Sequence, residues 1–301
     1  MVAVETQREL IHDPHFQQGF ILLDTTPGKR VVHGTVTNGT TTSIPAWDLA
    51  QWSSKFPLEI AGAQRLPDGT LLLTNEAKRV VAGSSGIDLA DLLLRVNGHV
   101  EYGDRARKTQ AEPWVHLLVQ QDFDNAPSLA ELSACCLHAE LRLNHSQLFR
   151  TPDYSASKHA AQYFIYFSVA NRNRNSPGYG QYFWFGIPVY DDRQRIAPAY
   201  QAQDFGETKM FIYTPAADVF AQDSPHDGKW VNFDADLLPL MVQGLNAGWK
   251  GGFMPGSREL ADYRIAGIFI GWEVPGIFDV EIQLRNLSLL GTFLESAAPS
   301  K

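Results

Sequence analysis

The sequence has few cysteines, little positive charge and no long apolar segment, and each shortage excludes a class of protein. Its 301 residues include only two cysteines, the neighbours Cys135 and Cys136, which excludes a scaffold built on disulfide bonds. The formal net charge is −8, whereas binding to nucleic-acid phosphates requires clustered positive charge. No segment approaches the roughly 20 apolar residues that cross a bilayer. We therefore expect neither nucleic acid nor a membrane as a partner.

Several familiar motifs are also missing. The N-terminal segment "MVAVETQRELIHDPHF" lacks the basic start and apolar run of a signal peptide, which predicts a cytoplasmic protein, with secretion of a longer precursor left open. No GxGxxG, Walker, GxSxG or HExxH motif occurs, which disfavours nucleotide, serine-hydrolase and transition-metal sites. We expect no cofactor. Only the loop oxygens of "QDFDNAPS" and "YDDR" are of the kind that a structural calcium ion prefers.

Short runs with period-two alternation fill most of the chain, as in antiparallel strands joined by loops. The candidates are 16–23, 30–37, 56–62, 70–74, 78–82, 92–100, 114–121, 136–145, 161–171, 181–191, 208–214, 263–273 and 278–290. This number of strands predicts a mainly β, two-sheet antiparallel sandwich. With no linker or repeat in view, residues 1–301 are expected to form one domain whose ends, 1–12 and 294–301, are loosely ordered.

Helix is expected in two places. In "NFDADLLPLMVQGLNAGWKGG" apolar residues follow helical spacing, Asp234 can cap the start, and glycines close the end. The segment "SLAELSAC", 128–135, predicts one or two helical turns between strands. Helices are therefore a minor part of the predicted fold.

The stretch "SPGYGQYFWFGIPVYDDR", residues 176–193, is unusually rich in aromatic rings. Because alternate side chains of a strand point to opposite sides, its apolar row of Phe183, Phe185, Ile187 and Val189 fits a core. The opposite row then carries Tyr182, Trp184 and Tyr190, and large exposed aromatics in a row are costly without a partner. We interpret this row as a ligand surface, although a small second core under a loop or helix would also explain it.

Other strong strands have polar faces opposite their core rows. Aromatic rings stack on the apolar faces of sugars, and planar polar groups bind the hydroxyls, so the mixture favours a saccharide ligand. A solvated sheet face has the same residue types, and this alternative stays open. The candidate substrate-binding residues are Tyr182, Trp184, Tyr190, Arg142, His116, Gln120 and Tyr166.

The candidate catalytic residues are Glu140, Glu273 and His138. Glu140 and Glu273 are the carboxylate pair that a glycoside hydrolase would need. A polysaccharide lyase would instead use a base such as His138 and a cation such as Arg142, which neutralises a uronate carboxylate. Two unrelated surface glutamates are the simpler alternative, and the sequence does not give their separation.

The run of strands, the aromatic polar face and the closing strand "FDVEIQLRNLSLLG" resemble the jelly-roll, concanavalin A-like sandwiches of carbohydrate-active proteins. The resemblance is one of architecture, because the E-x-D-x-x-E signature of laminarinase-like glycosidases and the Arg-x-Glu, Gln-Ile-His trio of one alginate-lyase group are both absent. It implies a carbohydrate-active enzyme, a hydrolase or lyase cleaving a poly- or oligosaccharide in a groove on one sheet. The alternatives are a lectin-like binder without catalysis and an assembly protein with Trp184 in an interface.

Overall fold

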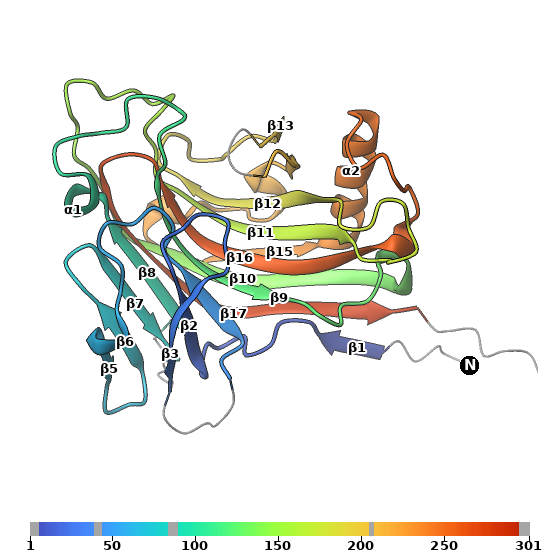
Figure 1. Ribbon diagram of the computed structural model, residues 1–301, viewed down its shortest axis with the longest axis horizontal. Coiled ribbons are helices and arrows are strands. Elements are labelled where there is room, and N and C mark those ends of the chain that lie inside the picture. The colour runs from blue at the N-terminus through green and yellow to red at the C-terminus, as the bar shows by residue number, and fades with distance from the viewer. Residues whose placement is uncertain (1–5, 39–43, 84–89, 205–207, 295–301) are drawn as a thin grey trace, which may run out of the picture.

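Two large sheets pack face to face in the computed structural model, which describes residues 6–38, 44–83, 90–204 and 208–294. The nine-stranded sheet faces the viewer in Figure 1, with the eight-stranded sheet behind it. In order, the nine strands are β13 (Tyr200–Gln203), β14 (Phe211–Thr214), β12 (Tyr182–Asp191), β11 (Gln162–Asn171), β16 (Tyr263–Val274), β9 (Val115–Asp122), β4 (Trp47–Ala50), β2 (Gly19–Leu23) and β3 (Val32–Thr37). The predicted mainly β sandwich is confirmed.

The eight-stranded sheet contains the longest strands of the described chain. Its order is β15 (Val231–Asp236), β10 (Leu132–Leu148), β17 (Phe278–Phe293), β8 (Leu92–Asn97), β7 (Lys78–Ala82), β6 (Leu71–Thr74) and β5 (Ala63–Arg65), and β1 (Thr6–Glu9) pairs with β17. Within the segment 1–12, expected to be loosely ordered, residues 6–9 form β1, while 1–5 and 295–301 lie outside the described residues. Most neighbours in both sheets are antiparallel; β12–β14 and β2–β4 are parallel.

The core lies between the sheets and is built by the alternation that the sequence shows. The row Phe183, Phe185 and Ile187 is fully buried, as are Ile165 and Phe167 on the neighbouring strand. The eight-stranded sheet contributes its own inward row from β10 and β17. The polar side chains of the same strands are thereby directed to the outer faces of the sandwich.

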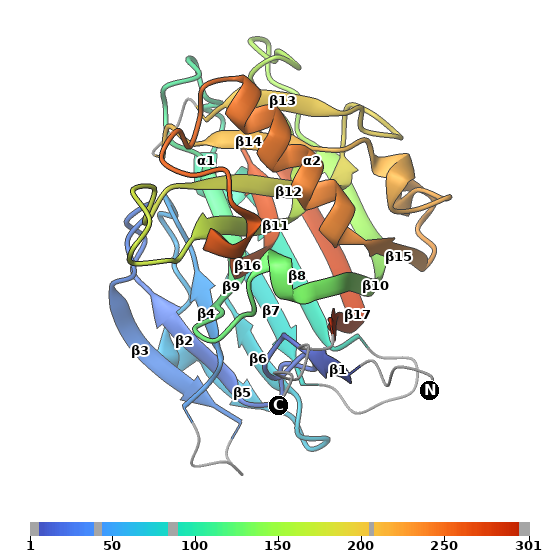
Figure 2. The same cartoon turned by 90° about the vertical axis from the view of Figure 1, so that its right-hand side faces the viewer.

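Helix α2 (Leu237–Lys250) lies across one end of the sandwich and contacts β10, β12 and β14 (Figure 2). Its cap is Asp236, whose carboxylate accepts the Leu238 N–H at 3.1 Å, so the expected capping by Asp234 is wrong. The strand β15 runs on to Asp236 and delays the helix by two residues. The expected turn near 128–135 is the 3₁₀ helix Leu129–Glu131, which begins at a capping box on Ser128.

A second, shorter helix connects the two sheets. The run expected as a strand over 92–100 ends at Asn97, whose side chain caps α1 (Gly98–Tyr102). The expected strand 56–62 contains the 3₁₀ helix Ile60–Gly62 instead. Further 3₁₀ turns are Ala217–Val219, Pro225–Asp227 and Leu260–Asp262. Within the described part of the chain, no helix has the length and apolar character to span a membrane.

Candidate functional site

The structure divides the predicted site residues between the two sheets. His138, Glu140 and Arg142 lie on β10 of the eight-stranded sheet, whereas Glu273 lies on β16 of the nine-stranded sheet. Each side chain points away from the shared core, so the two glutamates face opposite sides of the sandwich. The expectation that they form one catalytic pair is wrong. The alternation in the sequence shows on which face of a strand a side chain lies. It does not show which sheet the strand joins, because that depends on pairing with distant segments.

Glu140 is held by its own sheet. Its carboxylate accepts hydrogen bonds from the Arg285 guanidinium at 2.9 and 2.7 Å and from the Asn286 amide at 2.6 Å. Although burial raises the pKa of Glu140, the hydrogen bonds from Asn286 and Arg285 outweigh it and hold the pKa below its usual value. Glu140 therefore has the environment of a structural ion pair.

His138 and Arg142 are engaged in the same way along β10. His138 Nδ1 lies 2.5 Å from Asp234 Oδ1, and Arg142 donates to Gln283 Oε1 at 2.5 Å. The Arg142 guanidinium also lies 4.8 Å from the centre of the Trp230 ring. These contacts join neighbouring strands, so this outer face is a self-paired polar surface, and neither residue lies near the predicted aromatic row.

Tyr190 does not lie with Tyr182 and Trp184. A β-bulge shifts the pairing of β11 and β12, so that Tyr163 pairs with Tyr190 and Phe164 with Pro188. The extra residue reverses the alternation, and Tyr190 is buried with its hydroxyl donating to Ser146 on the other sheet at 2.9 Å. The expectation that Tyr190 binds substrate on the aromatic row is therefore wrong.

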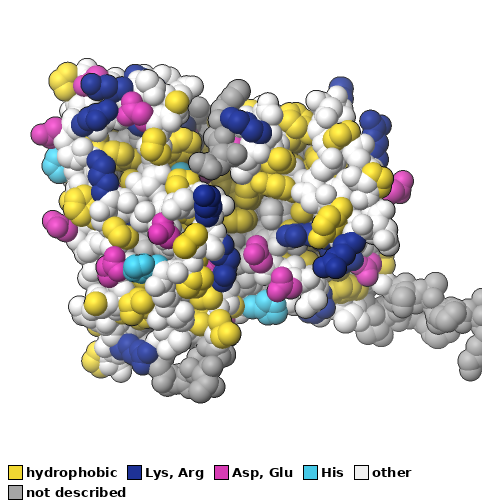
Figure 3. All heavy atoms as spheres, in the orientation of Figure 1, with side chains coloured by type: hydrophobic (Ala, Val, Ile, Leu, Met, Phe, Trp, Pro, Cys, Tyr) yellow, Lys and Arg dark blue, Asp and Glu magenta, His cyan; other side chains and the backbone are white. Residues whose placement is uncertain are grey.

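The remaining predicted residues share the outer face of the nine-stranded sheet. Its aromatic row consists of the half-buried Tyr182, Trp184, Tyr166, Phe164 and Phe269. Neighbouring rings are in contact, with centroids 5.3 Å apart for Tyr182 and Trp184 and 5.0 Å apart for Trp184 and Phe269. Figure 3 looks onto this face, which is hollowed beside its centre and has apolar side chains (yellow) there.

Thr208, which follows β13 in the chain, contacts the aromatic row. The Trp184 indole donates to the Thr208 hydroxyl at 3.2 Å, and that hydroxyl donates to Asp204 Oδ2 at 2.5 Å. These contacts place Asp204 above the edge of the aromatic row. Asp204 could not be identified from alternation, because it follows a four-residue strand whose pairing partner is also short.

Glu273 is the central carboxylate of this face. It pairs across the strands with His116, whose Nε2 lies 3.6 Å from Glu273 Oε2, and the Trp114 indole donates to the same oxygen at 3.1 Å. Burial is the largest influence on the pKa of Glu273 and raises it, but His116 and Trp114 more than offset this and lower the pKa. A quarter of the side chain is still exposed. Glu273 is therefore an ionised carboxylate that solvent still reaches.

Aromatic and cationic groups pack around Trp114 and His116, the two side chains that contact Glu273. The His116 ring stacks on Trp114 with centroids 5.4 Å apart and meets Trp52 edge-on at 5.6 Å. The Arg107 guanidinium lies 4.8 Å from the centre of the Trp114 ring. Sequence analysis missed Trp114, although its position two residues before His116 puts it on the same side of a strand.

Tyr166 connects the aromatic row to the carboxylates. Its ring lies over Gly186, where a Cβ would be 2.6 Å from a Tyr166 ring carbon, so only glycine leaves room for it. Burial, followed by the charges of Glu273 and Asp204, raises the pKa of Tyr166 well above its ordinary value. The phenol therefore stays protonated near two carboxylates. The charge of Asp204 also raises the pKa of Glu273, against the lowering by His116 and Trp114.

Gln120 lies farther along the same face, four residues from His116 on β9, or about 13 Å. Its amide lies 3.5 Å from Asp48 Oδ2, and Asp48 is held by both nitrogens of the Arg30 fork at 2.7 and 2.9 Å. Gln120 Oε1 is buried without a hydrogen-bond partner among the described residues. The face therefore has polar groups at two separated places, and Gln120 pairs across the strands with Phe269 of the aromatic row.

The described residues do not provide an evident metal site. Nowhere in the described part of the chain do three His, Cys, Asp or Glu side chains gather as metal ligands would. In the "YDDR" segment the Asp191 carboxylate is held by Arg193 at 2.8 and 2.6 Å, and a guanidinium in that place disfavours a cation. The structural calcium ion that the "YDDR" oxygens left open therefore has no fitting set of ligands at Asp191.

No family model matches the sequence, and no curated protein matches it. Solved structures with a similar fold include a family 12 xyloglucanase from Bacillus licheniformis (7% identity, TM-score 0.43, covering 81% of this chain and 99% of that one). A family 11 xylanase from Neocallimastix patriciarum (8%, 0.41, 82% and 100%) and an endoglucanase from Rhodothermus marinus (9%, 0.40, 81% and 99%) are also similar.

Proposed function

We propose that the outer face of the nine-stranded sheet binds a neutral oligo- or polysaccharide and that the protein is a glycoside hydrolase with Glu273 at its centre. The observation that carries this proposal is the ionised, partly exposed Glu273 carboxylate, held by Trp114 and His116 beside a row of half-buried rings. An ionised carboxylate serves as a nucleophile or as a base that activates water.

The second carboxylate of the proposed reaction is Asp204. It interacts electrostatically with Glu273, and its segment contacts Trp184. In hydrolysis the oxygen of a water molecule ends on the anomeric carbon, and one of its protons ends on the leaving oxygen, so one carboxyl group must donate and the other must accept. We assign the acceptor role to Glu273, whose pKa is lowered, and the donor role to Asp204.

Hydrolysis is favoured over elimination by the charges on this face. A lyase neutralises a uronate carboxylate with a cation, but Arg142 and His138 lie on the opposite sheet. Arg30 is paired with Asp48, and Arg107 donates to the carbonyls of Thr109 and Gln110. Glu273 and Asp204 would repel an acidic sugar, so the face favours a neutral one.

A lectin-like binder is the second candidate. Glu273 Oε2 already receives contacts from Trp114 and His116, as a structural carboxylate would, and the rings alone supply a sugar-binding surface. In that case the aromatic row is the whole function, and no bond is cleaved.

A polysaccharide panel separates these functions. The purified protein is incubated with neutral and acidic polysaccharides, and new reducing ends, absorbance near 235 nm for unsaturated products, and binding by affinity electrophoresis are measured. We expect reducing ends from a neutral glycan without absorbance at that wavelength. Binding without any product would support the lectin-like function, and unsaturated products from a uronate polymer would contradict the hydrolase proposal.

A further inference from the structure

Helix α1 reaches from the eight-stranded sheet to the proposed site on the other sheet. It follows β8 directly and is capped by Asn97, whose side-chain oxygen accepts the N–H groups of His99 and Val100 at 3.1 and 3.3 Å. The side chains of its last two residues contact two different segments: Glu101 accepts the Lys55 N–H, and Tyr102 donates to the carbonyl of Val274, the residue after Glu273. α1 therefore contacts segments next to Glu273 and next to its partner His116.

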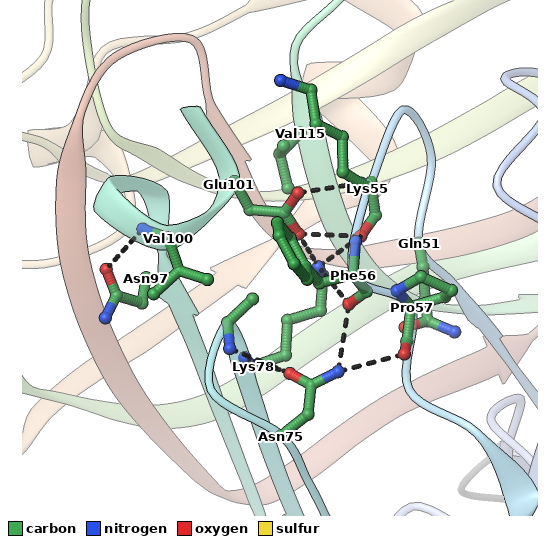
Figure 4. Close-up of polar contacts among 12 residues, drawn as sticks. Gln51, Lys55, Phe56, Pro57, Asn75, Lys78, Asn97, Val100, Glu101 and Val115 are labelled. Atoms are coloured by element: carbon green, nitrogen blue, oxygen red, sulfur yellow. Dashed lines mark hydrogen bonds and ion pairs between the residues drawn. The ribbon is translucent and has the colours of Figure 1, made fainter. Parts of the chain in front are cut away.

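Glu101 fixes the segment that contains Trp52. Its side chain is fully buried in an ion pair with Lys78, and it accepts hydrogen bonds from the Ser54 hydroxyl at 2.7 Å and the Lys55 N–H at 2.8 Å. Figure 4 shows Glu101, Lys78 and the backbone around Phe56 turned toward one another. A buried charge is retained only when its partners satisfy it, so this segment has one favourable position.

The position of this segment determines the contacts of His116 with Trp52. The carbonyl of Trp52, two residues before Ser54, accepts the His116 backbone N–H at 3.0 Å, and the Trp52 ring packs against the His116 ring. His116 in turn contacts Glu273 Oε2. A chain of direct contacts therefore joins the buried ion pair to the carboxylate.

Tyr102 holds the backbone next to both Glu273 and His116. Its hydroxyl donates to the Val274 carbonyl at 2.7 Å and accepts the Val115 N–H at 2.9 Å. Val274 directly follows Glu273, and Val115 lies between Trp114 and His116, the two residues that contact Glu273. The phenol therefore bridges the last residue pair of β9 and β16, Val115 and Val274, directly beside His116 and Glu273.

We propose that Glu101 and Tyr102 are positioning residues that hold Trp114 and His116 against Glu273. The proposal rests on the function assigned to Glu273 above, but its structural content is measurable without turnover. The groups that face Glu273 are Trp114 and His116 from the β9 side, Tyr166 from β11 and Asp204 after β13. Only the first two lower the pKa of Glu273, so displacing them leaves burial and Asp204, which raise it.

Tyr102→Phe tests the proposal, with Tyr263→Phe as the matched control. Tyr263 begins the same strand β16, and its buried hydroxyl likewise donates to a backbone carbonyl, that of Ser257, at 3.0 Å. The pKa of the Glu273 carboxyl is measured by carbon-13 NMR, with Glu273→Gln to assign the signal. We expect Tyr102→Phe to raise this pKa by about one unit, a tenfold change in the protonation equilibrium, and Tyr263→Phe to leave it unchanged.

Ser54→Ala provides a milder variant if Tyr102→Phe does not fold. It removes one donor to Glu101 and keeps the ion pair, so we expect a smaller rise of the Glu273 pKa. An unchanged Glu273 pKa in the folded variants, or an equal rise in Tyr263→Phe, would overturn the inference. A raised pKa in a protein that cleaves no glycan would support the positioning role and refute the proposed function, so the two failures are distinguishable.

Discussion

The two outer faces of the sandwich have similar residue types but differ in how their charges are satisfied. On the eight-stranded sheet, Glu140 forms an ion pair with Arg285 and Arg142 donates to the Gln283 amide oxygen, so neighbouring strands satisfy one another's hydrogen bonds. On the nine-stranded sheet, Glu273 keeps a quarter of its surface exposed among half-buried rings and interacts with a second carboxylate. Polar residues on an outer face are therefore not enough to identify a site. The distinguishing feature of Glu273 is a partly exposed carboxylate beside a row of aromatic rings.

The largest expected difference between the faces is in turnover. Glu273→Gln keeps the shape of the side chain but removes its charge, so we expect the rate of glycan cleavage to fall about 10²- to 10⁴-fold, as for loss of an acid–base group. Glu140→Gln is the control on the other face and is expected to cleave at the normal rate. Initial rates of reducing-end formation measure both. Equal losses in the two variants would remove the distinction between the faces.

The sequence predicted the strands well because alternation is local. The expected limits 161–171 and 263–273 differ by one residue at one end from β11 and β16. The sequence predicted the site less accurately than the strands, because the sheet that a strand joins depends on pairing partners far along the chain. This is why Glu140 was paired with Glu273, and why the bulge that turns Tyr190 inward was missed.

The next largest effect is on stability and compares a buried pair with a surface pair. Glu101→Gln leaves the Lys78 ammonium buried without its counter-charge, so we expect the free energy of unfolding to fall by about 3–5 kcal/mol. Glu140→Gln breaks a partly exposed pair, and a change below about 1 kcal/mol is expected. Urea unfolding followed by tryptophan fluorescence measures both. Similar losses would mean that the ion pair beneath the proposed site is no more important than the surface pair.

A smaller effect concerns ligand binding by the aromatic rings. Trp184→Ala removes a ring that contacts Tyr182 and Phe269, and we expect about tenfold weaker glycan binding, near 1.4 kcal/mol. Trp230→Ala removes the ring between the Arg142 and Arg285 side chains on the other face, and no change in binding is expected. Titration calorimetry with the glycan that the panel identifies gives both values. Weaker binding in Trp230→Ala would place the ligand on the eight-stranded sheet.

The smallest expected effect is a pH dependence of opposite sign on the two sheets. Burial raises the pKa of Asp192, directly after β12, to about 6, against an opposing hydrogen bond from the Ala161 N–H. Because this pKa lies above the usual value of 3.8, the folded protein binds the extra proton, and its stability falls as the pH rises from about 4 to 6. Asp192→Asn removes that cost and keeps the acceptor oxygen. We expect a gain of about 1 kcal/mol at pH 7, reduced by the solvent around this half-exposed group, and none near pH 3.

Glu140→Gln should change stability in the other direction. Its hydrogen bonds lower the pKa of Glu140 below 4.5, so the carboxylate stabilises the folded state above that pH, and this contribution is lost as the pH falls through the lowered pKa. The variant is therefore slightly less stable than the parent at pH 7 and equal to it in acid. Urea unfolding of both variants at pH 3 and pH 7 measures the contrast. A change of the same sign in the free energy of unfolding of both variants at pH 7 would contradict this contrast. The folded state gains from losing a carboxylate charge only where burial outweighs the hydrogen bonds, as at Asp192. At Glu140 the hydrogen bonds outweigh burial.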